Sequence, residues 1–175
     1  LHILLDIGDF GNPQVQSVYA IADGAAMASP RTTLRAQTFD PVTNKLTANA
    51  VDWTTNRGWY FDLPVGQQAN THPVLGFGNV AVVTNKTGVT DCTASSYIYT
   101  VSLEFGTTPV GATTVQTVLS STTNTSDPDV FRVAGTSGEL VASGRLYDGD
   151  QWRFKMPDSK AAKARRLARL IAAAP

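Results

Sequence analysis

The hydrophobic residues of this chain recur mainly at every second position, in short runs that Gly, Pro, Asn and Asp interrupt. The longest run covers residues 97–105, where every second position is filled by Tyr97, Tyr99, Val101, Leu103 and Phe105. A period of two predicts a β-strand, because successive side chains of a strand point to opposite faces. The stretch 80–83 is continuously apolar, which predicts a strand deep inside a sheet.

Shorter runs of the same kind predict further strands at 1–5, 15–22, 33–39, 45–51, 58–63, 73–75, 79–84, 115–119, 130–134, 139–143 and 151–156. The strands at 33–39 and 45–51 are expected to pair as a hairpin around Asp40-Pro41. Gly76–Asn79 predicts a Gly-rich reversal, and Asp148-Gly149 predicts a two-residue type I′ turn. Many short strands spaced about ten residues apart are typical of a sandwich, barrel or propeller.

The segment Arg57–Pro64 is the one around which we expect the fold to be organised. Trp59 and Phe61 alternate with Tyr60 and Asp62, so one face of a strand is aromatic. Pro64 closes the run, since proline cannot donate to a sheet ladder. Trp53 lies six positions before Trp59, and two large rings so close predict a core with an aromatic centre. We interpret the segment as a buried strand and not as a ligand platform.

The last segment differs in kind from the β-rich domain predicted for residues 1–157. Residues 158–175 predict a short helix that Asp158 or Ser159 caps and that ends near Ala174. Its cationic side chains are Lys160, Lys163, Arg165, Arg166 and Arg169. Two interpretations stay open: a terminal helix packed by Leu167, Leu170 and Ile171, or a basic arm for an acidic partner or an anionic membrane surface.

Composition adds a few bounds. The chain has 175 residues, enough for one domain, and 42% of them are hydrophobic. The net charge is zero, so no global electrostatic argument favours nucleic acid or membrane. No apolar run is long enough to span a bilayer.

The chain begins at Leu1 within a predicted strand, and we therefore expect it to be a piece of a longer protein. Cys92 is the one cysteine, either a reduced thiol or half of a bridge whose mate lies elsewhere.

The residue types needed for common catalytic chemistry are scarce. His2 and His72 are the two histidines, and the chain has no Gly-x-Ser-x-Gly elbow. His72 precedes Pro73 and is interpreted as a structural residue at a strand start. One cysteine and two separated histidines do not make a zinc site. A hydrolase would need convergent carboxylates, and the sequence does not place Asp52, Asp62, Glu104 and Glu139 relative to one another. We therefore predict no catalytic residue.

Calcium is the one cofactor for which oxygen-rich stretches exist. Asp6, Asp9 and Asn12 are three residues apart, 124–129 offers alternating oxygens, and Asp148–Asp150 is better explained as a hairpin turn. None of the three forms the full pattern of a calcium loop, with several oxygen ligands and a Gly in a short span. We predict no tight metal site and no bound cofactor.

Several segments, taken in order, resemble one family. They are Gly8-Asp9, Gln16–Ile21, Val51–Trp53, Arg57–Pro64, Asn70–Val74 and Asp91-Cys92. They are similar to the C-terminal propeller of the PilY1 family, whose pattern reads TGD…QSFYAI, then VDW…RGWYLDLP, a DPVL strand and a DPC loop. The resemblance covers about residues 1–105. Its most specific part is the set Trp53, Arg57, Gly58, Trp59, Tyr60, Phe61, Asp62, Leu63 and Pro64. The Asp-rich calcium loop of that family has no matching positions here, since Gly106–Gly111 follows Phe105.

The resemblance implies an all-β fold made of β-propeller blades, here an incomplete set, followed by the short C-terminal helix. It implies a non-enzymatic module for type IV pilus (fimbrium) biogenesis and cell adhesion, exported to the periplasm, the bacterial surface or the pilus. Its partners would be minor pilins or other pilus subunits and a host or abiotic surface, met by loops such as Asn85–Ser96 and Ser120–Asp129. An incomplete set of blades would expose an apolar flank, which favours self-association or contact with upstream blades. The alternative is a secreted β-rich domain, unrelated to pili, that binds or hydrolyses glycans.

Overall fold

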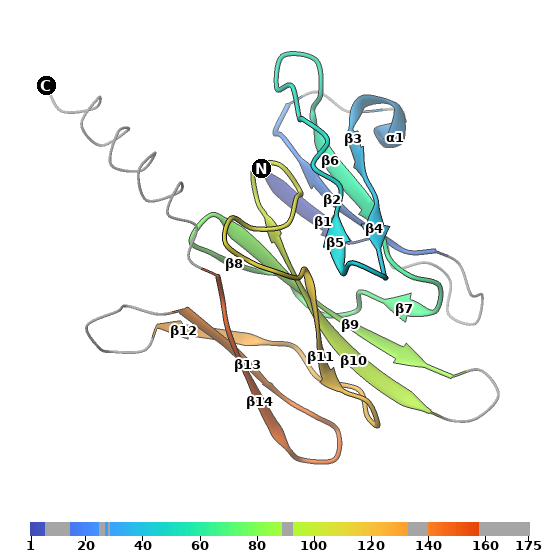
Figure 1. The fold of residues 1–175 in the computed structure, drawn as a ribbon, viewed down its shortest axis with the longest axis vertical. Coiled ribbons are helices and arrows are strands. Elements are labelled where there is room, and N and C mark those ends of the chain that lie inside the picture. Colours follow the sequence, from blue (N-terminus) through green and yellow to red (C-terminus); the bar gives the residue numbers. More distant parts are fainter. Residues whose placement is uncertain (6–14, 25–26, 28, 89–92, 133–139, 158–175) are drawn as a thin grey trace, which may run out of the picture.

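The computed structural model describes residues 1–5, 15–24, 27, 29–88, 93–132 and 140–157. Within these residues the regular structure is 14 strands and one short helix, which confirms the all-β prediction. Figure 1 shows the three larger sheets stacked along the long axis of the molecule, and a fourth sheet has only two strands. The described residues form neither a closed barrel nor a closed propeller.

The first sheet contains the strand with the Trp-Tyr-Phe run. Its strands in spatial order are β1 (His2–Leu5), β2 (Ser17–Ile21), β6 (Gly58–Asp62) and β3 (Arg35–Gln37). All pairs are antiparallel except β3 with β6, which is parallel. The helix α1 (Pro30–Thr33) leads into β3, and a hairpin of β4 (Phe39–Asp40) and β5 (Lys45–Leu46) follows it.

The middle and third sheets are antiparallel and follow the order of the chain. The middle sheet consists of β7 (Gln67–Gln68), β8 (Val74–Gly76), β9 (Asn79–Thr87), β10 (Ala94–Ser102) and β11 (Gln116–Ser120). Both β7 and β8 pair with β9, one at each end of it, so the sheet is four strands wide. The third sheet consists of β12 (Asp129–Arg132), β13 (Leu140–Arg145) and β14 (Gln151–Lys155).

The central strands of the middle sheet, β9 and β10, are buried on both faces, because each neighbouring sheet covers one of them. Toward the first sheet lies the first core, which includes Val18, Ala20, Trp59, Phe61, Val80, Val82, Tyr99 and Val101. Toward the third sheet lies the second core, formed by Ala81, Val83, Ile98, Ala142, Trp152 and Met156. All four residues of the run 80–83 are fully buried, as predicted, and adjacent residues of that run belong to different cores.

Trp59 joins the first sheet to the middle sheet. Its indole is fully buried and stacks on the ring of Phe61, with the centroids 6.3 Å apart. Its Nε1 donates a hydrogen bond of 3.0 Å to the carbonyl of Leu103. Gly106 lies against the face of the indole, where a Cβ would come within 2.4 Å of the ring. These contacts fix the position of β6 relative to the end of β10.

Two buried asparagines of β9 hold the third sheet in place. The Asn85 amide donates to the carbonyl of Thr125 and accepts from its backbone N–H, both at 2.9 Å. The Thr125 hydroxyl in turn accepts from Trp152 Nε1 at 2.6 Å. Near the other end of β9, Asn79 Nδ2 donates to the Pro157 carbonyl at 2.7 Å. Because buried polar groups are costly without partners, these bonds specify how the third sheet docks.

A buried tyrosine connects four strands of the middle sheet. The Tyr99 hydroxyl donates to Gln67 Oε1 at 2.8 Å and accepts from Gln116 Nε2. Gln67 Oε1 also accepts from the Thr84 hydroxyl at 3.1 Å. Burial raises the pKa of Tyr99 above its usual value, so the hydroxyl remains a donor at any physiological pH.

The predicted reversal at Gly76–Asn79 is confirmed. Phe77 and Gly78 have φ of 51° and 78°, the two positive values that a type I′ turn requires. The predicted I′ turn at Asp148-Gly149 is wrong in type, although the chain does reverse there. Only Gly149 has a positive φ, of 101°, and the Asp148 carboxylate accepts from the Asp150 N–H at 3.1 Å. A three-residue loop closed by glycine replaces the two-residue turn.

The predicted hairpin of 33–39 with 45–51 is confirmed only next to its turn, where Phe39 pairs with Leu46 and Asp40 with Lys45. Only β4 and β5 form a hairpin, while β3 pairs in parallel with β6. The Gln37 carboxamide explains part of this, because it bonds the Thr47 hydroxyl at 2.9 Å and the Asn49 carbonyl at 2.8 Å. Side-chain bonds thus take the place of the expected ladder between the two segments.

The two loops expected to be displayed are smaller or less free than predicted. β9 extends to Thr87 and β10 begins at Ala94, so the connection is shorter than Asn85–Ser96. In the stretch 120–129, Thr125 is buried and bridges Leu146. The predicted helix at 158–174 lies outside the described residues, as do Cys92 and the oxygen-rich residues Asp6, Asp9 and Asn12.

Replacement of Gly58 by alanine tests the close packing of β6 on β2. Gly58 has a φ of 143°, and a Cβ there would lie 1.8 Å from the Ala20 carbonyl oxygen. We expect Gly58→Ala to lower the free energy of unfolding by about 3 kcal/mol or more in urea titrations. Gly111 is the matched control, because its φ is 82° and nothing lies within 4 Å. Gly111→Ala should cost about 1 kcal/mol, and equal losses in the two variants would contradict the packing described.

Candidate interaction surface on β6

The strand β6 places the residues of the sequence motif on two opposite faces. Trp59, Phe61 and Leu63 are buried in the first core, which confirms the interpretation of the segment as a buried strand. Tyr60 and Asp62 alternate with them and point away from that core. The motif therefore contributes to a surface only through its outward side chains and through its end at Pro64.

Trp53 does not belong to the aromatic core, so that part of the prediction is wrong. Its side chain is 39% exposed, in the turn that precedes β6. The Asp52 carboxylate holds this turn, accepting from the backbone N–H of Thr54 at 3.0 Å and from its hydroxyl at 2.7 Å. These bonds keep the pKa of Asp52 below its usual value. Arg57 connects the turn to β2, since its Nη2 donates to the Ala22 carbonyl at 3.2 Å.

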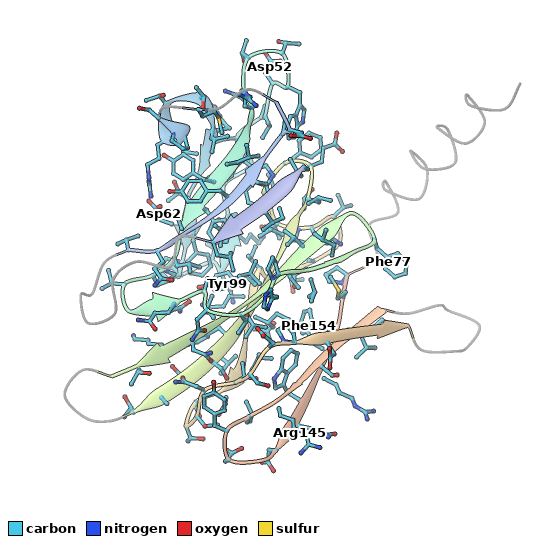
Figure 2. All side chains as sticks on the ribbon, turned by 180° about the vertical axis from the view of Figure 1, so that it is seen from behind. Asp52, Asp62, Phe77, Tyr99, Arg145 and Phe154 are labelled. Atoms are coloured by element: carbon cyan, nitrogen blue, oxygen red, sulfur yellow. The ribbon has the colours of Figure 1, made fainter. Side chains whose placement is uncertain are left out.

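The outward face of the first sheet carries a cluster of two tyrosines, an arginine and an aspartate. Tyr19 and Tyr60 are Cα partners and their rings stack, with the centroids 5.8 Å apart. The guanidinium carbon of Arg31 lies 4.7 Å from the Tyr60 centroid. Arg31 Nη2 lies 2.6 Å from both Asp62 Oδ1 and the Ser17 hydroxyl. Figure 2 shows Asp62 at the end of β6 from which the chain continues toward the middle sheet.

Two opposing effects set the ionisation of Asp62. Partial burial by itself raises the pKa of the carboxyl, but hydrogen bonds from Arg31 and Ser17 outweigh it. The net result is a pKa below the usual value, so Asp62 is ionised at neutral pH. With Arg31 positioned by α1, the cluster forms a charge-balanced and preordered patch.

A shallow apolar groove with a volume of about 370 Å³ begins where β6 ends. Its apolar walls come from distant parts of the chain: Val15, Phe39, Pro41, Leu63, Pro64 and Val65. Val15 and Val65 are 44% and 60% exposed, and Asp62 provides a polar margin. Grooves of this composition bind aliphatic or aromatic side chains of a partner.

The remaining candidates from the sequence do not converge on a catalytic centre. His72 lies just before β8, where its backbone N–H and its ring Nδ1 contact the Asp127 carboxylate at 2.9 and 3.1 Å. Asp52 precedes β6 and Asp62 ends it, while Glu139 lies outside the described residues. In the described ranges, no group of three or more His, Cys, Asp or Glu side chains could hold a metal ion.

The comparisons with known proteins leave the family open. No protein family, curated protein or solved structure matches this chain. Among the residues that the structure describes, no helix is long and apolar enough to cross a bilayer.

Sequence reasoning did not find the arginine of the cluster or the groove. Arg31 lies at the end of a segment expected to be loop, and no periodic signal marks it. The groove residues are scattered between positions 15 and 65, and only the fold brings them together. One weak signal was available, since the apolar Val65 follows Pro64, outside the predicted strand at 58–63.

The ion pair between Arg31 and Asp62 should show a characteristic pH dependence. Because the pKa of Asp62 is lowered on folding, its contribution is present above the unfolded pKa of about 3.9. It is lost as the pH falls through the lower folded value. Both side chains are nearly half exposed, so we expect a coupling of about 1 kcal/mol or less at pH 7. A double-mutant cycle with Arg31→Met and Asp62→Asn, measured by urea unfolding at pH 7 and pH 2.5, should show a smaller coupling at the lower pH. A coupling that is equal at the two pH values would contradict the ion pair.

Proposed function

We propose that this chain is a non-enzymatic module of a PilY1-like protein that acts in type IV pilus assembly and adhesion. In this role the protein is exported and meets its partners in the periplasm, at the bacterial surface or on the pilus. The partners are minor pilins or other pilus subunits, and the mechanism is the presentation of a fixed surface on a β-scaffold.

The stacking of sheets supports this proposal at the level of architecture. The middle sheet is antiparallel, follows the chain order and packs face to face with both neighbours. Propeller blades pack in the same way, so we interpret the three sheets as consecutive blades. The first sheet departs from a simple blade, because β3 is parallel to β6 and lies at the edge.

The observation that carries the functional part is the apolar groove at the end of β6. It lies at the end of the segment on which the PilY1 resemblance depends, and its walls include exposed valines and prolines. A partner that inserts an aliphatic or aromatic side chain there would remove this surface from water, at roughly 25 cal/mol per Å². The groove is small, so it can anchor a contact but supplies only part of the affinity.

A charge placed in the groove should weaken the contact. We expect Val65→Asp in the full-length parent to reduce capture of purified minor pilins at least about tenfold, because an unpaired carboxylate would be buried in the contact. Val110 is 70% exposed and does not line the groove, so Val110→Asp is the matched control and should leave capture unchanged.

The same pair of variants can be tested in cells. In a strain lacking the parent gene, the Val110→Asp gene should restore twitching motility and surface attachment, and the Val65→Asp gene should not. Retention of pilin capture by Val65→Asp, or an equal loss in both variants, would overturn the groove as the contact. Failure of the wild-type parent to bind any pilus subunit would overturn the proposed function itself.

A further inference from the structure

A second groove lies on the outer face of the third sheet, the face turned away from the second core. It has a volume of about 270 Å³ and is lined mainly by polar and charged side chains, notably Asp127, Asp129, Ser143, Arg145, Gln151 and Arg153. Figure 2 shows Arg145 at the far end of the molecule, while Phe154 lies between the third and the middle sheet. None of these lining residues belongs to the surface proposed for pilus contacts.

The strand register places the two arginines at diagonal corners of one array. Ser143 pairs with Arg153, and Arg145 pairs with Gln151, across β13 and β14. Trp152 and Ala142 alternate with these residues and are buried in the second core. All four corner side chains therefore project into the same outer face, and two of the four are guanidinium groups.

The two arginines of this array have no side-chain partner in the described part of the chain, although Asp127 and Asp129 border the same groove. There, no hydrogen bond or ion pair engages the guanidinium group of Arg145 or of Arg153. Asp127 is already held by the backbone and ring of His72. The two guanidinium groups can therefore donate together to an anion bound between them. Guanidinium groups suit carboxylates in particular, which they bind with paired hydrogen bonds.

The rest of the lining limits which anion fits. Asp127 and Asp129 border the groove, so a ligand that carries only negative charge would be repelled by them. A ligand with one carboxylate and several hydroxyl groups satisfies both kinds of residue, since its hydroxyls donate to the aspartates and its carboxylate accepts from the arginines. Ser143 and Gln151 add groups that both donate and accept. An acidic peptide would instead bring further carboxylates against Asp127 and Asp129.

We infer that this groove binds an acidic sugar, a uronic acid unit of a polysaccharide, with Arg145 and Arg153 holding its carboxylate. The volume is at the small end of ligand sites, which usually begin near 300 Å³, so the groove takes a single ring of a longer chain. The inference does not depend on the pilus proposal, because it uses a different sheet and different residues.

Titration of the full chain with trigalacturonate, followed by ¹H–¹⁵N NMR, tests the inference. We expect shifts of the backbone amides of β13 and β14, and binding that weakens as salt is added. Arg145→Gln and Arg153→Gln should each weaken binding at least about tenfold, because each removes a charge-assisted contact. Arg35, an exposed arginine of β3 on the first sheet, is the matched control, and Arg35→Gln should change affinity less than about twofold.

Three comparison ligands decide the chemical class. A neutral galactose trimer should bind much more weakly than trigalacturonate, and equal binding would overturn the role of the arginines. Pentaglutamate or sulfate binding as tightly as trigalacturonate would overturn the assignment to a sugar. Failure of the wild-type chain to bind trigalacturonate would overturn the site. Affinities of the arginine variants are compared with the wild type only where their unliganded spectra match.

Discussion

The burial of β9 and β10 on both faces is the constraint on which the rest of this structure depends. Val82 and Val83 are adjacent in sequence and both fully buried, yet one packs under the first sheet and the other under the third. The middle sheet therefore belongs to two cores at once. Neither outer sheet has a second layer among the described residues, so each depends on the middle sheet for its own burial.

Directional bonds determine how the outer sheets sit on this shared layer. Hydrophobic burial alone would tolerate slippage of a valine-rich sheet. The Trp59 indole bound to the Leu103 carbonyl and the Asn85 amide bound to Thr125 remove that freedom. A scaffold fixed in this way holds each outer sheet in a constant position on the middle sheet. The apolar groove of the first sheet and the charged groove of the third are therefore preorganised, which lowers the entropic cost of binding.

Local patterns predicted much of the fold, and non-local pairing accounts for most of what they missed. The apolar run 80–83 and the alternation that begins at Tyr97 both predicted strands, but β10 ends at Ser102 and residues 103–105 form a turn. The alternation also suggested one polar face for β10, but Ser96 and Thr100 are buried beneath the third sheet. The parallel pairing of β3 with β6 joins segments about twenty residues apart, and no local signal encodes it. The apolar groove gathers residues from positions 15 to 65 and could not be read from the sequence, whereas the charged groove lies mainly on the local hairpin of β13 and β14.

The indole Nε1 signals of Trp59 and Trp152 report the two cores separately, and their unfolding in urea tests the shared middle sheet most directly. Val82→Ala creates a cavity in the first core only, at a cost of about 2 kcal/mol. If the middle sheet couples the two cores, both indole signals should lose the same free energy of unfolding. A loss seen at Trp59, with the midpoint of Trp152 unchanged, would show that the third sheet unfolds independently and would contradict the account.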